Sequence, residues 1–329
     1  MPANLTPQYF EAERKYRNAC TLEEKLEALK FMLAEIPKHK GTEKLQAELK
    51  RKIAKTRSEL QKAAHHGPKA HSFYVAREGA GQVALVGPPN SGKSSLVCTL
   101  THARPEVAEY PFSTRQPCPG MMTFENIQIQ LVDLPPVSAE YMEFWVPNLI
   151  RTADAVALIV DLTAADPLEQ VEATRELLRQ KKLELVKSIA GQPENISIAY
   201  KRTVLLGNKI DLDTNWQTFQ ILQEMFAADF NLYPLSVKDA QLLEQFKRVI
   251  FAALEIVRVY SKPPGKEVDL QEPFILPKGS TLFELAVSVH REFADKLHFA
   301  RIWGSGKFDG QRMNRDYILQ DGDVVELHG

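Results

Sequence analysis

The sequence predicts an α/β protein: a central domain with a parallel sheet, preceded by an N-terminal helical hairpin and followed by a C-terminal ubiquitin-like β-grasp domain. Three observations predict this fold. Strand-like and helical runs alternate from residue 81 to 260, leucines recur at helical spacing before residue 66, and a short α+β pattern follows residue 268. Glycine and proline mark linkers at 67–80 and 261–267, so the predicted domains are 1–66, 81–260 and 268–329.

The N-terminal segment has the pattern of two helices. Leucine and isoleucine recur at three- and four-residue steps from Leu22 to Ile36 and again from Leu45 to Leu60, and the run from Pro37 to Gly41 separates them. We therefore expect an antiparallel hairpin. Between Lys38 and Lys62 there are nine basic and three acidic side chains, and this local excess has two interpretations: a solvated helix face or a contact with RNA phosphates.

The middle segment predicts a sheet with both faces covered. Strand-like runs at 127–132, 155–160, 203–206 and 233–235 alternate with helical stretches, which is typical of parallel strands joined by helices. In such sheets ligands bind beyond the carboxyl ends of the strands. We expect Asp133, at the end of one of these runs, to reach that edge.

Residues 87–94 form a phosphate-binding loop, or P-loop, with the sequence Gly-Pro-Pro-Asn-Ser-Gly-Lys-Ser. Backbone N–H groups of such a loop point at phosphates, Lys93 supplies positive charge, and Ser94 is the expected Mg²⁺ ligand. A buried strand at 83–86 precedes the loop and a helix begins at Lys93, so its context is correct. The predicted phosphate-binding residues are Gly87, Pro88, Pro89, Asn90, Ser91, Gly92, Lys93, Ser94 and Ser95.

A second motif, Asn208-Lys209-Ile210-Asp211, predicts guanine as the base. The carboxylate of Asp211 can accept hydrogen bonds from the N1 and N2 donors of guanine, whereas adenine would leave it unpaired. We expect Asn208 to brace the loop and the base edge, and the stem of Lys209 to cover the purine face. Alone, the motif could be an ordinary polar turn. Behind a P-loop it predicts GTP and GDP, and it disfavours an ATPase.

The C-terminal segment has a small α+β pattern. A short strand pair, a helix near Leu282 to Ala294 and a strand at 298–303 precede a turn at Asp321-Gly322-Asp323 and a final strand at 324–327. This order fits a β-grasp domain. A segment of about 60 residues can hold only a modest core, so we expect an interaction module rather than a catalyst.

The composition limits the cellular compartments and the classes of partner that we expect. Lys and Arg number 41 against 42 Asp and Glu, so the overall charge indicates neither DNA nor a membrane surface. The three cysteines lack metal-ligand or disulfide spacing, which is typical of reduced cytoplasmic thiols. The N-terminus has no apolar signal core, and no stretch approaches the roughly 20 apolar residues of a membrane span. We expect a cytoplasmic protein without a membrane partner.

With these motifs together, the chain resembles the developmentally regulated GTP-binding proteins of the Obg-like GTPase superfamily, over nearly its whole length. The most specific stretches are 259–263, 299–305 and 321–325, which look like the TGS domain of that family. The resemblance implies ribosome-associated GTP hydrolysis in the cytoplasm. It implies the ribosome or structured RNA as a partner, and it is compatible with a protein partner that binds through the TGS domain.

The resemblance also assigns residues at the site. Residues 110–114, Tyr-Pro-Phe-Ser-Thr, are similar to switch I of the family, which implies that Thr114 binds Mg²⁺ and senses the γ-phosphate. Residues 235–238, Leu-Ser-Val-Lys, look like the final guanine loop. This implies that Ser236 and Val237 lie at the base, with the Val237 N–H directed at O6.

The chain departs from the family pattern in two places. Too few residues separate Asp133 from Asn208 for the extra domain of eukaryotic and archaeal members, so we expect a compact relative of bacterial type. The family pattern Asp-x-Pro-Gly appears as Asp133-Leu134-Pro135-Pro136. Proline has no N–H, so Pro136 removes the usual switch II donor to the γ-phosphate. The resemblance still implies that Asp133 holds Mg²⁺ through water.

Hydrolysis is expected to be slow, because Val137 stands where many GTPases have a water-orienting glutamine. Asn90 resembles an asparagine that holds K⁺ against the phosphates in certain GTPases; the alternative is that it only braces the loop. Catalysis by Lys93, Thr114 and Asn90 would then be electrostatic. Two functions remain open: a slow, potassium-assisted GTPase acting with ribosomes or RNA, and a GTP/GDP-binding scaffold that Pro136 has uncoupled from hydrolysis.

Overall fold

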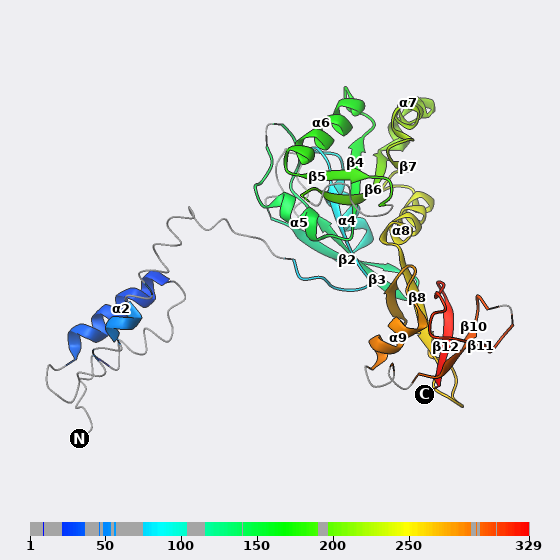
Figure 1. Ribbon diagram of the computed structural model, residues 1–329. Helices are drawn as coiled ribbons and strands as arrows, with labels where there is room; N and C mark the ends of the chain where they lie inside the picture. The colour runs from blue at the N-terminus through cyan, green and yellow to red at the C-terminus, as the bar shows by residue number, and fades with distance from the viewer. Residues whose placement is uncertain are drawn as a thin grey trace, which may run out of the picture. The chain divides into compact units, whose positions relative to one another are not determined.

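The computed structural model divides the chain into two compact units, residues 1–72 and residues 73–329 (Figure 1). The structure describes residues 9, 22–36, 46, 49–53, 56, 75–103, 116–139, 141–189, 197–290, 294, 297–306 and 308–328.

The first unit contains helix α2, Leu22–Glu35. Leu29 and Met32 of this helix are buried together with Leu49 and Ile53, which come from the second of the two predicted helical runs. The apolar spacing in both runs therefore contributes to one small core. Much of the predicted hairpin, including its turn at 37–41, lies outside the described residues.

A mostly parallel sheet is the centre of the second unit. Among the described residues it has seven strands, in the order β2-β3-β1-β4-β6-β5, and β7 also pairs with β6. The strands are β1 Gln82–Val86, β2 Cys118–Phe124, β3 Ile127–Asp133, β4 Ala155–Asp161, β5 Leu183–Val186, β6 Ala199–Asn208 and β7 Asn231–Leu235. All their pairings are parallel except that of β2 with β3, which form a hairpin.

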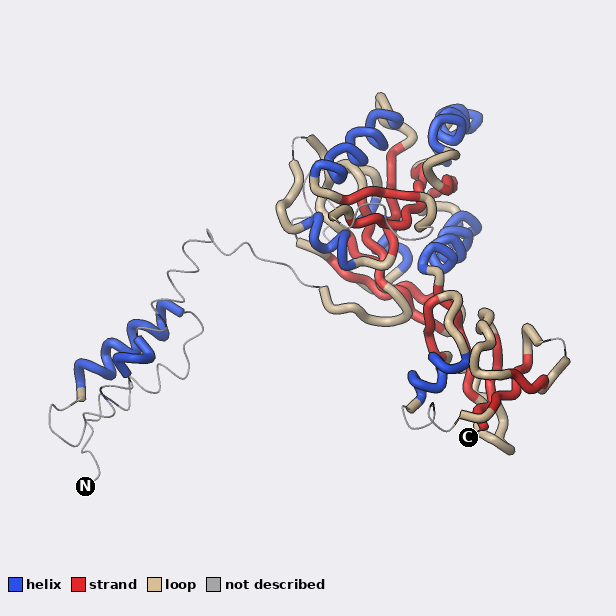
Figure 2. The backbone as a smooth tube through the Cα atoms, in the orientation of Figure 1, coloured by secondary structure: helices blue, strands red, loops and turns tan. Residues whose placement is uncertain are grey.

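Helices cover both faces of this sheet (Figure 2). They are α4 Lys93–Leu100, α5 Val146–Thr152, α6 Pro167–Gln180, α7 Gln217–Phe226 and α8 Ala240–Leu254. Alternate residues of β4 face opposite layers: Val156 and Leu158 pack with α5, α6 and α7, while Ala157 and Ile159 pack with α4 and α8. This two-sided burial explains the continuous apolar runs of the strands, and the predicted α/β fold is confirmed.

Side chains fix where two of these helices begin. The carboxylate of Asp166 accepts a hydrogen bond from the Glu169 N–H at 2.9 Å at the start of α6. Asp239 accepts from the N–H groups of Gln241 and Leu242 at the start of α8. Such caps satisfy N–H groups that have no partner inside the helix. Among the described helices, none is long and apolar enough to cross a membrane.

A second sheet follows, with the strand order β11-β10-β12-β8-β9 in the described part of the chain. Its elements are β8 Ile256–Ser261, β9 Phe274–Pro277, α9 Leu282–Val289, β10 Phe299–Trp303, β11 Gln311–Met313 and β12 Asp323–His328. Helix α9 starts in a capping box of Thr281 and Glu284 and buries Leu282 and Leu285 against Ile302 of the sheet. One helix packed on a mixed sheet is the β-grasp arrangement predicted for this segment.

The second sheet begins earlier than the sequence indicates. Its strand β8 starts at Ile256, directly after α8 and Glu255, whereas the sequence places a linker at 261–267 and the domain at 268. Ser261 pairs with Val325, and the Lys262 N–H donates to the Val325 carbonyl at 2.8 Å. The proline-rich stretch after Lys262 therefore forms a turn inside the domain and not its boundary.

Arg258 of β8 joins the two sheets. Its guanidinium donates to both carboxylate oxygens of Asp321, at 3.1 and 2.8 Å, and also to Glu125 in the turn between β2 and β3. The same group lies over the ring of Phe251, 4.8 Å from its centre. Beside it, Asn126 of that turn donates to the Tyr260 hydroxyl at 2.7 Å. The β2–β3 hairpin is thus held against the first strand of the second sheet.

We expect Arg258→Ala to destabilise the second unit by about 2–3 kcal/mol, because it leaves the Asp321 carboxylate partly buried without its cation. Chemical denaturation of the full chain measures the loss. Arg179→Ala is the control: Arg179 also makes a two-point contact with a carboxylate, that of Glu184, but it is exposed, so the loss should stay below about 1 kcal/mol. Equal losses in the two variants would contradict a structural role for the Arg258 joint.

Candidate nucleotide-binding site

The P-loop connects β1 to α4 and packs directly on neighbouring backbone and side chains. Gly87 has φ 154°, and a Cβ there would lie 2.1 Å from the carbonyl oxygen of Ile159. Gly92 has φ 94°, and a Cβ there would lie 2.2 Å from Nδ2 of Asn208. Only glycine fits at either position. The loop is therefore closely packed against β4 on one side and against the predicted guanine motif on the other.

Lys93 points back into the loop. Its Nζ donates to the carbonyl oxygens of Gly87 at 3.0 Å and Pro88 at 2.8 Å, with Oγ of Ser91 at 3.3 Å. Burial lowers the pKa of Lys93 to about 8, against the opposing effect of the Asp133 carboxylate. A phosphate bound in the loop would offset this cost of burial, because it would add negative charge beside the ammonium group.

The predicted Mg²⁺ ligands meet at the end of β3. The Ser94 hydroxyl donates to Oδ2 of Asp133 at 2.6 Å. Oδ1 of the same carboxylate is buried and has no hydrogen-bond partner among the described residues. Burial raises the pKa of Asp133, although the Ser94 hydroxyl and Lys93 act against this. A buried carboxylate oxygen without a partner, beside a hydroxyl, fits an oxygen-seeking cation such as Mg²⁺. Thr114 lies outside the described residues.

The guanine motif lies next to the P-loop. Asp161 and Asn208 are the last residues of β4 and β6 and pair in register, so the motif begins at the same sheet edge. The Asn208 amide is buried and donates to the Ser91 carbonyl at 2.7 Å. One side chain thereby links the end of β6 to the loop that would hold the phosphates.

The carboxylate of Asp211 is held in place. The Ser236 hydroxyl donates to Oδ1 at 2.7 Å, and Nζ of Lys238 donates to Oδ2 at 2.9 Å. These hydrogen bonds, that from Ser236 first, lower the pKa of Asp211. The group is therefore an ionised acceptor near the surface. Val237, the predicted source of the O6 contact, is half-buried between Ser236 and Lys238.

Three predicted residues belong to the loop and the start of α4 but make no side-chain hydrogen bond to the rest of the described chain. Asn90 is exposed with φ 58°, and Pro89 and Ser95 are half-buried before and after Gly92. The structure therefore brings the phosphate, metal and base candidates to one edge of the sheet, apart from Thr114.

Two contacts were not predicted from the sequence. Nζ of Lys209 lies 2.6 Å from Oδ2 of Asp161. The N–H of Val137 donates to the Gly87 carbonyl at 3.1 Å, and Val137 is 1% exposed. Asp161 directly follows a predicted strand but belongs to neither nucleotide motif, so nothing in the sequence marks it as a site residue. Likewise, the sequence shows that Pro136 lacks an N–H but not where the next N–H points.

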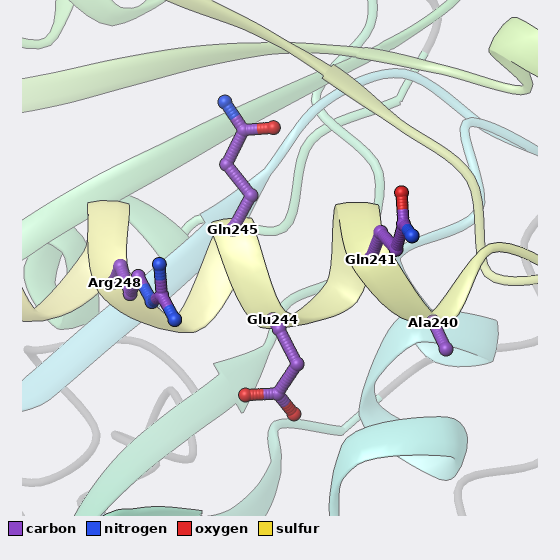
Figure 3. Close-up of a pocket in the computed structure, with 5 residues that line it drawn as sticks. All are labelled: Ala240, Gln241, Glu244, Gln245 and Arg248. Atoms are coloured by element: carbon purple, nitrogen blue, oxygen red, sulfur yellow. The ribbon is translucent and has the colours of Figure 1, made fainter.

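A hollow lies elsewhere, along α8 (Figure 3). It is lined by Ala240, Gln241, Glu244, Gln245 and Arg248. The labelled side chains leave the helix in different directions and do not converge on a common point. None of them belongs to the motifs above, so the hollow is not part of the nucleotide site.

Comparison with protein families agrees with this site. Residues 82–190 match the family described as "50S ribosome-binding GTPase", and residues 257–328 match the TGS domain. The TGS match begins one residue after the start of β8, in agreement with the second sheet. The chain therefore contains a GTPase domain followed by a TGS domain.

Similarity to whole proteins covers most of the chain. An uncharacterized GTP-binding protein of Methanocaldococcus jannaschii is 27% identical over 366 residues, covering 93% of this chain and 92% of the relative. GTP-binding protein 1 of Schizosaccharomyces pombe is 27% identical over 363 residues, covering 92% and 98%. Developmentally-regulated G-protein 3 of Arabidopsis thaliana is 26% identical over 363 residues, covering 93% and 98%. The resemblance to developmentally regulated GTP-binding proteins is confirmed.

Proposed function

We propose that this chain, a GTPase-domain and TGS-domain relative of the developmentally regulated GTP-binding proteins, binds GTP and GDP with Mg²⁺ and hydrolyses GTP slowly. One observation supports this most strongly: the hydrogen bond from the Asn208 amide to the Ser91 carbonyl, at 2.7 Å, links the base motif to the phosphate loop. Two motifs far apart in the sequence thus lie next to each other at one sheet edge, as a single nucleotide site requires.

The chemistry that these residues support is electrostatic. Lys93 and the backbone N–H groups of the P-loop stabilise negative charge that develops on the phosphate oxygens. Ser94 and Asp133 would hold Mg²⁺, which would supply further positive charge beside the phosphates. Val137 has no polar head group to orient the attacking water, so this role is left to the backbone and to solvent, and turnover is slow.

GTP and GDP should bind with Mg²⁺, and ATP should bind at least about tenfold more weakly, because adenine offers no donors to the Asp211 carboxylate. Asp211→Asn should remove that preference. Titration calorimetry with GTP, GDP and ATP measures it. Asp213→Asn is the matched control, since this neighbouring carboxylate caps the start of α7 through the Thr218 and Phe219 N–H groups. Equal GTP and ATP affinities in the unaltered chain would refute the base assignment.

The scaffold hypothesis is favoured by a different observation. Leu134, Pro135, Pro136 and Val137 are all buried, and the Val137 N–H is bonded to the Gly87 carbonyl. The segment after Asp133 therefore has neither an N–H at position 136 nor an unbonded N–H at position 137 to offer a γ-phosphate. If this packing persists with GTP bound, the segment does not distinguish GTP from GDP.

Single-turnover hydrolysis separates the two hypotheses. For the slow GTPase we expect unassisted rates on the order of 10⁻⁴ to 10⁻² per second. If Asn90 holds K⁺, the rate in K⁺ exceeds that in Na⁺, and Asn90→Ala removes the difference. Thr99→Ala, at an exposed position of α4 outside the loop, controls for general disturbance of this region. No hydrolysis in either salt would support the scaffold, and equal rates in both salts would reject the potassium role alone.

We further propose a ribosome or structured RNA as the partner in the cytoplasm, with the TGS domain as a second contact for RNA or protein. The matched family carries a ribosome-binding description, and the described part of the basic stretch exposes Lys50, Arg51 and Lys52. Phosphate contacts made by such side chains release counterions and weaken steeply with salt.

Cosedimentation with ribosomes across a salt series tests this proposal. Lys50→Glu with Arg51→Glu should weaken binding and flatten its salt dependence, without changing GTP affinity. Lys181→Glu with Lys182→Glu is the charge-matched control, because both lysines are exposed on the GTPase domain. Binding that ignores salt, or equal losses in both double variants, would leave the basic stretch as a solvated helix face.

A further inference from the structure

Asp161 holds the lysine of the guanine motif from the neighbouring strand. The Lys209 ammonium lies 2.6 Å from Oδ2 of Asp161, and the two side chains are 33% and 12% exposed. Asp161 is not part of either nucleotide motif. We propose that it is a positioning residue for base recognition: it fixes Lys209 so that the lysine stem lies where the purine face stacks. This inference rests on the proposed nucleotide function.

The carboxylate of Asp161 is itself oriented. Its Oδ1 accepts two hydrogen bonds from Thr163, one from the N–H at 2.9 Å and one from the hydroxyl at 2.7 Å. The Asp161 N–H donates to the side chain of Gln170 in α6 at 3.1 Å. With Oδ1 occupied in this way, Oδ2 faces Lys209.

The backbone places Lys209 for the same contact. Asn208 pairs in register with Asp161, and the Leu162 N–H donates to the Asn208 carbonyl at 3.1 Å, so the two strand ends are tied together. Lys209 then adopts left-handed geometry, φ 64° and ψ 35°. The chain leaves β6 at this residue, and the Lys209 side chain reaches the end of β4, where its ammonium group contacts Asp161.

The physical effect is preorganisation. A lysine side chain has several rotatable bonds, and ordering it only when the nucleotide binds would cost affinity. An ion pair with a largely buried carboxylate orders the stem beforehand. The role of Asp161 is therefore distinct from that of Asp211: Asp161 acts on the flat face of any purine, whereas Asp211 reads the edge that is specific to guanine.

The test compares GDP with IDP, whose base lacks the N2 amino group. Asp161→Asn should weaken both nucleotides by a similar factor, about tenfold, and leave their ratio unchanged. Asp211→Asn should change the ratio. Glu184→Gln is the matched control, because it removes a carboxylate paired with Arg179 on the same domain, and it should leave both affinities unchanged.

A double-mutant cycle with Lys209→Met separates positioning from general damage, since methionine keeps an apolar stem but cannot pair with Asp161. In the Lys209→Met background, Asp161→Asn should cost nothing further. Affinity for inorganic tripolyphosphate, measured by competition, should be unchanged in every variant, because the P-loop is intact. Should Asp161→Asn fail to fold, Thr163→Ala provides a second route: it removes one of the bonds that orient the carboxylate and should weaken GDP about twofold.

Unchanged GDP affinity in Asp161→Asn, or an equal loss in the Lys209→Met background, would overturn the positioning role. If the unaltered chain binds neither GDP nor GTP, the proposed function itself is wrong. If it binds GDP with an affinity that Asp161→Asn does not change, only the positioning role is wrong.

Discussion

The close approach of the P-loop to its neighbours is the constraint on which the site depends. Gly87 lies against the backbone of β4 and Gly92 lies against Asn208, so neither position has space for a Cβ. Because these contacts leave no space for an added atom, the loop, β4 and the guanine motif fix each other's positions. The buried ammonium group of Lys93 then has a fixed position inside the loop. Hydrogen bonds to two loop carbonyl oxygens offset the free-energy cost of removing it from water.

Much of this arrangement was predictable because it rests on local patterns. The continuous apolar run of β4, the P-loop and the guanine motif each determine structure within a few residues of themselves, and the parallel topology then brings them to one edge. The start of the second sheet was not predictable in the same way. Strand β8 continues from α8 without a turn signal, and what makes it a strand of that sheet is pairing with β12 and β9, which lie far along the chain.

The missed contacts at the site have the same origin. Asp161 owes its place to register with Asn208 across two strands, and no spacing in the sequence encodes that neighbour. The sequence identified Pro136 as a lost donor, but the fate of the following N–H depends on the burial of Val137 in the core beneath the sheet. The alignments with relatives run over more positions than the 329 residues of this chain, so those proteins contain segments without a counterpart here.

Helix α8 has a consequence for how the two domains can move. It spans Ala240–Leu254, so it begins two residues after Lys238 of the loop that holds Asp211, and only Glu255 separates it from β8. A 15-residue helix is a stiff rod of about 22 Å. The base-recognition loop and the first strand of the TGS sheet therefore lie at opposite ends of one rigid helix. The contacts of Arg258 with Asp321 and Glu125 lie beside the C-terminal end of this helix. If α8 tilted at the end that follows the base-recognition loop, the TGS domain would be displaced, because only Glu255 lies between α8 and β8.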